Sequence, residues 1–184
     1  MKLIDKQAIK QFFRSGIFAS PENYLKKQGV KVGTGCFISP CNVMANEGYL
    51  IEIGNYVRIA QNVKFFTHGG IYPFQVKYNN PHLDHFGKIK IGDYVSIGEG
   101  TRLMPGVVIG NDVIIGAGSV ITKSIPDNCM VAGNPAKIIG KTDEFYKKVL
   151  ELNTESGKMN EEEKKKFLLN LPEDAFVRKP FMKA

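Results

Sequence analysis

Residues 91–126 read IGDYVS IGEGTR LMPGVV IGNDVI IGAGSV ITKSIP, six consecutive blocks of six residues. Each block begins with Ile or Leu, the fifth residue is Val, Thr, Ser or Ile, and the second is Gly in four of the six. Neither the 3.6-residue period of a helix nor the two-residue alternation of a strand gives this spacing. The stretch therefore predicts a structural repeat in which each block supplies one short strand and one turn.

Stacking of such blocks explains the residue types. The large aliphatic residue in the first position is expected to point inward, and the small or β-branched residue in the fifth position to fill the neighbouring corner. We expect the glycine in the second position to provide a positive φ where the chain bends sharply. Each coil would then complete the core of the next, so the predicted fold class is an all-β solenoid of parallel strands.

The repeat divides the chain into three segments. It begins less regularly near Val32, is restored over residues 53–64, and breaks between Phe65 and Ile91. The break is an inserted loop, about residues 68–88, and long ordered loops usually carry function. We predict an N-terminal helical cap at 1–29, a solenoid domain at 30–140 and a C-terminal helical extension at 141–184.

Both terminal segments have helix signals. The first contains a short amphipathic pattern around Ile9, Phe12 and Phe13. In the last, Asn160 followed by Glu163 predicts a capping box that opens a helix. Helices at these ends would cover strand edges that a solenoid otherwise exposes.

Composition narrows the class of protein. The chain has 184 residues, of which 43% are hydrophobic and 23% charged, so an ordered core is expected. There is no run of about 18 apolar residues and no secretion signal, which predicts a cytoplasmic protein without a membrane span. Cys36, Cys41 and Cys129 are an odd number without metal-like spacing, and we interpret them as free thiols.

The formal net charge of +7 does not indicate a nucleic-acid partner. Many of the lysines lie in the C-terminal third and are mixed with glutamates, as on a solvated helix face. Basic and aromatic residues do not interleave as a base-stacking platform requires. A phosphorylated small molecule is the more plausible acidic partner.

Residues 91–139 resemble the hexapeptide-repeat O-acetyltransferases. The resemblance rests on the hexads, on Ile121-Thr-Lys-Ser-Ile-Pro126 and on Gly133-Asn-Pro-Ala-Lys137, and it covers about residues 30–140. It is greatest to the maltose, galactoside, capsule and O-antigen sugar acetyltransferases. The hexads specify only the fold, whereas the two other segments are specific for the branch that uses coenzyme A.

This resemblance implies a left-handed parallel β-helix and a homotrimer with active sites between subunits. It implies acetyl-coenzyme A as donor, a hydroxyl of a sugar or sugar-containing intermediate as acceptor, and no catalytic metal. The family's catalytic histidine stands at the base of the inserted loop, where this chain has His68. A positioned imidazole that takes the proton of a hydroxyl contributes about 100- to 10,000-fold to the rate. Because the thioester is already activated, direct attack needs no acyl-enzyme and no role for the cysteines.

The resemblance also assigns residues to the donor. Backbone groups of Gly98, Ala117 and Gly118 would meet the pantetheine amides, Thr122 and Lys123 would lie near the far end of the arm, and Lys137 near the nucleotide phosphates. For the two lysines the alternative is a solvated surface position. Several sugar acetyltransferases have an arginine three residues beyond this last lysine, where the chain has glycine followed by Lys141.

The acceptor site is less determined by the sequence. Tyr72 and Tyr78, with two nearby phenylalanines, could stack on a sugar or hold the loop closed, and both alternatives stay open. Asp84 is a candidate acceptor of a hydrogen bond from a substrate hydroxyl or from the imidazole of His68. Whether His68 has a carboxylate partner is not decided by the sequence. His82 and His85 are expected to be ordinary loop histidines.

Other functions remain as alternatives. A γ-type carbonic anhydrase has the same solenoid, but two of the three histidines here lie inside the inserted loop. A non-catalytic scaffold would not need an intact His68 segment. Among acyltransferases, streptogramin, serine and amino-sugar N-acetyltransferases stay open, although 29 residues before Val30 are too few for the helical domain of a serine acetyltransferase.

Overall fold

A computed structural model describes residues 20–44 and 46–182. The amphipathic helix predicted around Ile9, Phe12 and Phe13 lies outside these residues. The chain separates into two compact units, one up to Thr142 and one from Asp143 onward.

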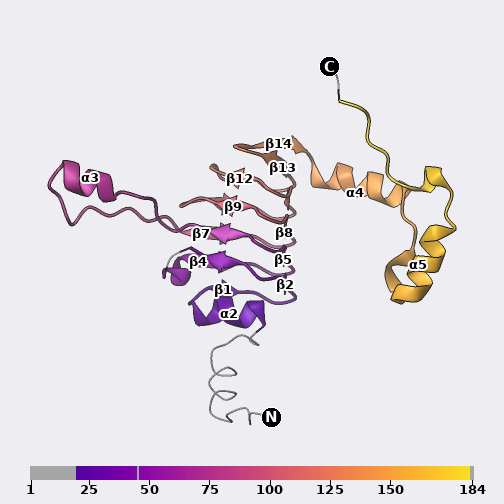
Figure 1. Cartoon of the computed structure of the whole chain (residues 1–184), viewed down its shortest axis with the longest axis horizontal. Coiled ribbons are helices and arrows are strands. Elements are labelled where there is room, and N and C mark those ends of the chain that lie inside the picture. Colours follow the sequence, from indigo (N-terminus) through magenta and orange to yellow (C-terminus); the bar gives the residue numbers. More distant parts are fainter. Residues whose placement is uncertain (1–19, 45, 183–184) are drawn as a thin grey trace, which may run out of the picture. The chain divides into compact units, whose positions relative to one another are not determined.

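The first unit is a solenoid built from three sheets, which we name A, B and C (Figure 1). Sheet A contains β1 (Lys31–Val32), β4 (Ile51–Ile53), β7 (Ile89–Ile91) and β10 (Val108–Ile109). Sheet B contains β2 (Phe37–Ile38), β5 (Arg58–Ile59), β8 (Ser96–Ile97), β11 (Ile114–Ile115), β13 (Met130–Gly133) and β14 (Ala136–Gly140). Sheet C contains β3 (Asn42–Val43), β6 (Lys64–Phe65), β9 (Arg102–Leu103) and β12 (Val120–Ile121).

Up to β12 the chain visits sheets A, B and C in turn, so three strands make one coil. Pairing between coils is parallel until the final hairpin, where β14 runs antiparallel to β13. Parallel stacking of two-residue strands is what a six-residue repeat predicts, and the solenoid is confirmed. The antiparallel hairpin was not predicted, and it covers the last parallel strand of sheet B.

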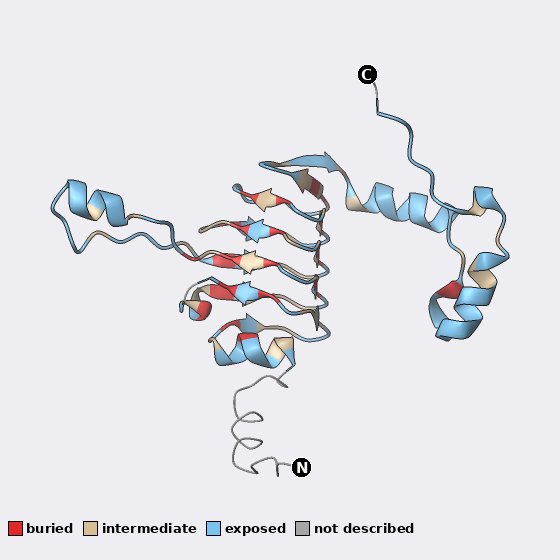
Figure 2. Ribbon diagram, in the orientation of Figure 1, coloured by how far each residue is buried: buried red, intermediate tan, exposed pale blue. Residues whose placement is uncertain are grey.

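The core follows the hexad positions. The first-position residues of the six blocks are all buried, from Ile91 to Ile121, and so are the fifth-position residues, from Val95 to Ile125. Like residues lie above like residues, as where Ile97 pairs with Ile59 on one side and Ile115 on the other. Figure 2 shows the resulting buried segments repeating from coil to coil. Burial of one such side chain contributes about 1.5–3 kcal/mol, so the column supplies most of the solenoid's stability.

Second-position glycines have a different role from the one predicted. Gly92 and Gly98 do not adopt a positive φ. A Cβ on Gly92 would lie 2.5 Å from Asn111 Oδ1, and one on Gly98 would lie 2.4 Å from the backbone nitrogen of Ala117. The coils approach too closely for a side chain at this position. Positive φ falls instead on the fourth position of five hexads: Tyr94, Gly100, Gly106, Asp112 and Gly118.

The corner between sheets A and B is tied by side-chain oxygens that reach the coil below. The backbone N–H of Asn55 donates to Asp93 Oδ1 at 2.7 Å, and that of Asp93 donates to Asn111 Oδ1 at 2.8 Å. Asp127 Oδ1 continues the series by accepting from Asn111 at 2.8 Å. This ladder satisfies turn N–H groups that the strands cannot pair and fixes the distance between coils.

The inserted segment leaves the solenoid between β6 and β7. It contains a helix, α3 (Tyr72–Lys77), which projects away from the coils (Figure 1). The sequence predicted turns here and not a helix, although Pro73 is a residue favoured in a first helical turn. At the base of the segment, the Gly87 N–H donates to the Thr67 carbonyl at 2.8 Å and His68 forms an isolated bridge with Phe86.

In the chain, one described helix precedes the coils and several follow them. Helix α2 (Pro21–Lys27) has Ser20 as its N-cap and buries Leu25 in the solenoid core. The second unit contains α4 (Thr142–Glu151, whose first residue belongs to the solenoid unit), η2 (Ser156–Lys158), α5 (Glu161–Leu169) and η3 (Glu173–Ala175). The predicted capping box of Asn160 and Glu163 is confirmed. No helix among the described residues is long and apolar enough to cross a bilayer.

Candidate active site

His68 lies at the corner between sheets C and A, three residues after β6 ends. The preceding residue, Thr67, is fully buried, whereas 40% of the His68 side chain is exposed. The imidazole contacts the edge of Phe86, with ring centroids 5.5 Å apart at 75°. The base of the insertion therefore anchors the histidine on its backbone side and leaves part of the ring open to solvent.

A carboxylate contacts this imidazole. Glu47 Oε2 lies 3.3 Å from His68 Nδ1 and accepts a hydrogen bond of 2.9 Å from the Thr67 hydroxyl. Glu47 directly precedes η1 (Gly48–Leu50), and a Cβ on Gly48 would lie 2.1 Å from the Gln28 carbonyl oxygen. Only glycine fits so close to α2, and this contact fixes the backbone that carries Glu47.

The hydrogen bond from Thr67 is the main reason why the pKa of Glu47 is lowered from its usual value, and His68 lowers it further. The Glu47 side chain is 18% exposed, so its charge is partly shielded from water. An ionised carboxylate only accepts hydrogen bonds, so a neutral imidazole that keeps this contact has its proton on Nδ1. The lone pair is then on Nε2, which is the arrangement a general base requires.

Glu47 was not among the residues predicted from the sequence. The two residues are 21 positions apart. Glu47 lies in the corner after β3 and His68 in the corner after β6, and these corners stack in adjacent coils. That stacking can be predicted only from the number of residues in each coil. Asp84, the carboxylate that the sequence offered, accepts a 2.8 Å hydrogen bond from the backbone of His85. The structure pairs the imidazole with Glu47, and a role for Asp84 in binding the acceptor stays a prediction.

Five of the six predicted donor residues occupy two different corners. Thr122 and Lys123 follow β12 and lie at the C-to-A corner, in line with His68. Gly98, Ala117 and Gly118 lie at the B-to-C corner, which a single chain does not bring together with His68.

Two of the backbone groups expected to meet pantetheine are already engaged. The Gly98 N–H donates to the Ile115 carbonyl at 2.8 Å, and the Gly118 N–H donates to the Glu99 carbonyl at 2.7 Å. These two N–H groups hold the coils together. Lys137 is exposed on β14. The roles predicted for all six donor residues stay predictions.

The predicted acceptor aromatics lie on the projecting segment. Tyr72 and Tyr78 are 72% and 64% exposed, and Tyr78 stacks on Phe74 with ring centroids 6.4 Å apart. His82 and His85 are exposed as well. Within the described residues, no three His, Cys, Asp or Glu side chains are grouped as metal ligands.

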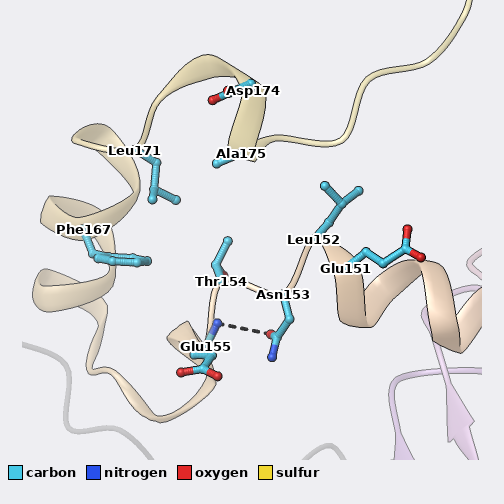
Figure 3. Close-up of a pocket in the computed structure, with 9 residues that line it drawn as sticks. All are labelled: Glu151, Leu152, Asn153, Thr154, Glu155, Phe167, Leu171, Asp174 and Ala175. Carbon is cyan, nitrogen blue, oxygen red and sulfur yellow. Dashed lines mark hydrogen bonds between the residues drawn. The ribbon is translucent and has the colours of Figure 1, made fainter.

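Two cavities differ in their relation to this site. One, of about 450 Å³, is lined by residues of the first coils: Tyr24, Gln28, Asn42, Val43, Met44, Asn46 and Lys64. Its lining includes Asn46, the residue before Glu47, but not Glu47, Thr67 or His68. The other, of about 520 Å³, lies in the second unit, between the end of α4 and the α5–η3 segment (Figure 3). None of the residues predicted for the site lines this second cavity, and its carboxylates Glu151, Glu155 and Asp174 have no histidine beside them.

Comparison with known proteins identifies the family. Residues 88–123 match the bacterial transferase hexapeptide (six repeats) family. Protein CapG of Staphylococcus aureus is 47% identical over 152 residues, which cover 81% of this chain and 87% of CapG. The chain belongs to the hexapeptide-repeat acetyltransferases. The resemblance seen in the sequence is thereby confirmed, and the protein is an acyltransferase.

Solved structures of other hexapeptide-repeat acetyltransferases agree. A maltose O-acetyltransferase from Clostridium difficile 630 is 33% identical, with a TM-score of 0.51 over 65% of this chain and 73% of that one. A Vibrio cholerae hexapeptide-repeat acetyltransferase in complex with acetyl-coenzyme A is 26% identical, with a TM-score of 0.54 over 62% and 61% of the two chains.

Proposed function

We propose that this protein transfers an acetyl group from acetyl-coenzyme A to a hydroxyl of a sugar or of a sugar-containing intermediate. The observation that carries the proposal is the Glu47–His68 contact, with Thr67 on the same carboxylate, at the base of the inserted segment. The similarity to a maltose O-acetyltransferase supports the acceptor class, and the acetyl-coenzyme A complex of the Vibrio cholerae relative supports the donor.

In the proposed reaction His68 is the general base. Nε2 takes the proton of the acceptor hydroxyl while its oxygen attacks the thioester carbonyl carbon. The tetrahedral intermediate collapses, the carbon–sulfur bond breaks, and the imidazolium returns the proton to the leaving thiolate. Glu47 keeps the ring oriented and stabilises the imidazolium between the two proton transfers, as a buried carboxylate does in hydrolytic triads. No acyl-enzyme forms, and the step uses no metal.

We propose that the functional assembly is a homotrimer of left-handed coils, located in the cytoplasm where the donor is made. The separation of the two corners within one chain supports a shared site. His68 of one subunit would then meet the Gly98, Ala117 and Gly118 corner of a neighbour. Thr122 and Lys123 would contact the donor's arm, and Lys137 its phosphates, since a lysine binds phosphate as a point charge.

A panel of acceptors tests the proposal and separates it from its alternatives. Thiol release from acetyl-coenzyme A would be measured with sugars, serine, amino sugars and a streptogramin. Release that requires a sugar supports the proposal, and release with serine, an amino group or the antibiotic would replace it. If coenzyme A does not bind at all, the donor assignment is wrong, and a scaffold or a metal-dependent anhydrase would be tested by metal content.

A further inference from the structure

The outward surface of sheet C has an unusual arrangement of charge. In cross-strand register, Asn42 pairs with Lys64 and Lys64 pairs with Arg102. Neighbouring strands are about 4.8 Å apart. Two like charges directly opposite each other destabilise a sheet by a few tenths of a kcal/mol to about 1 kcal/mol. Across the residues that the structure describes, neither cation forms an ion pair.

Sheet A has the opposite arrangement at equivalent positions. There Glu52 lies between Lys31 and Lys90 and contacts both, with Nζ–carboxylate distances of 3.0 and 3.7 Å. The fold therefore neutralises one column of outward cations with an acid and leaves the other column without one. Adjacent cations without an anion of their own are an attractive site for an anion from solution.

The cavity of about 450 Å³ lies at this column, and its lining includes Asn46, the residue before Glu47. Lys64 and Asn42 line it, as do Asn46 and Gln28. The side chains of these three amide residues make no hydrogen bond to any other described residue. Lys64 precedes His68 by four positions, so the two Cα atoms are at most about 14 Å apart. A ligand in the cavity can therefore reach from Lys64 towards the imidazole.

We propose that this cavity is an acceptor subsite for a sugar that has an anionic substituent, a carboxylate or a phosphate. Lys64, reinforced by Arg102, binds the anionic group. The amides of Asn42, Asn46 and Gln28 both donate and accept, which suits sugar hydroxyls. This inference rests on the proposed function and narrows its acceptor class. The donor's own phosphates are assigned to Lys137 on the last strand of sheet B, several coils away.

Matched acceptors test the subsite. Initial rates would be compared for galactose against galacturonate and for N-acetylglucosamine against its 1-phosphate, with wild-type protein, Lys64→Gln and Arg102→Gln. Lys90→Gln is the control, because it removes the same charge from an outward strand position on sheet A. We expect wild type to prefer the anionic member of at least one pair, and Lys64→Gln to lower that preference, as a ratio of kcat/KM values, at least tenfold. Lys90→Gln should leave the ratio unchanged.

Three results would overturn the subsite. One is an equal loss of kcat/KM in Lys64→Gln for both members of each acceptor pair. Another is a raised KM for acetyl-coenzyme A in Lys64→Gln, which would assign the lysine to the donor. The third is loss of the assembly in that variant, which would make the column a contact between subunits.

Direct binding distinguishes failure of the subsite from failure of the proposed function. Titration calorimetry with galacturonate and with N-acetylglucosamine 1-phosphate would use His68→Ala protein, with and without Lys64→Gln. Binding that Lys64→Gln abolishes supports the subsite even if no acceptor is acetylated. Acetylation of neutral sugars without any binding of the anionic ones would overturn the subsite and leave the function standing. Neither acetylation nor binding would overturn both.

Discussion

Replacing Glu47 with Gln should reduce turnover without unfolding the protein. Gln has the same shape, and its carbonyl oxygen can still accept from the Thr67 hydroxyl. Because Oε2 contacts both groups, the same Gln oxygen would also face His68 Nδ1, but it has no negative charge to stabilise the imidazolium that forms. Proton transfer from the acceptor hydroxyl to Nε2 would therefore be less favourable than in wild type.

The size of the effect follows from the contact. A hydrogen bond to a charged group contributes about 1.5–3 kcal/mol. The Nδ1–Oε2 distance is 3.3 Å and the imidazole is 40% exposed, so we expect the lower end of that range. About 1.5–2 kcal/mol corresponds to about a 10- to 30-fold lower kcat. Thiol release at saturating donor and acceptor would measure it, with the KM for acetyl-coenzyme A and the melting temperature as controls. A kcat within twofold of wild type would refute the assigned role.

The ionisation of Glu47 predicts how the stability of the protein depends on pH. Its pKa is lowered in the folded protein, chiefly by the Thr67 hydroxyl. A lowered carboxyl pKa stabilises the native state above the unfolded value, near 4.3, and this contribution is lost as the pH falls through the folded value. Urea unfolding of wild type and Glu47→Gln should therefore differ most near pH 7, and the difference should shrink below about pH 4. A difference that grows in acid would contradict the pairing.

Four further substitutions test the fold and the donor site. Gly92→Ala should lower the free energy of unfolding by about 1–3 kcal/mol, because its Cβ would clash with the next coil. Gly100→Asn should be nearly neutral in urea unfolding, because Gly100 has a φ of +70° and open space around it. Ile97→Ala should lower the free energy of unfolding by about 2–5 kcal/mol in the same measurement. A loss under about 1 kcal/mol would mean that the column is not a packed core. Lys137→Ala should raise the KM for acetyl-coenzyme A more than that for the acceptor, and an unchanged donor KM would remove it from the phosphate site.

The hexads predicted the solenoid because its core is periodic. A residue in the first or fifth position is buried whatever its coil, so burial of Ile97 or Thr101 needs no knowledge of long-range contacts. The role of the second-position glycine was predicted wrongly, because it depends on contacts between coils and not on the hexad itself. Close approach of Gly98 to Ala117 is a property of stacked coils and is not visible within one hexad.

The candidate site was predictable only in part. His68 was predicted from the family resemblance and from its position where the repeat ends, and its role stays a prediction. Glu47 could not be predicted, since the segment between β3 and β4 has no regular hexad and the contact spans 21 positions. The Lys64–Arg102 column was hidden in the same way. Both residues hold the sixth position of a hexad, but the insertion between them conceals that their coils are adjacent. Helix α3 lies in a segment whose Asn and Pro residues favour turns.

The most direct test of the central claim is thiol release from acetyl-coenzyme A by wild type and His68→Ala across a sugar panel. We predict release that depends on a particular sugar in wild type. In the variant it should fall at least about 100-fold, the lower bound for a general base, with the assembly and donor binding intact. Release that persists in His68→Ala at a comparable rate would contradict the account, because the hydroxyl would then lose its proton to another group.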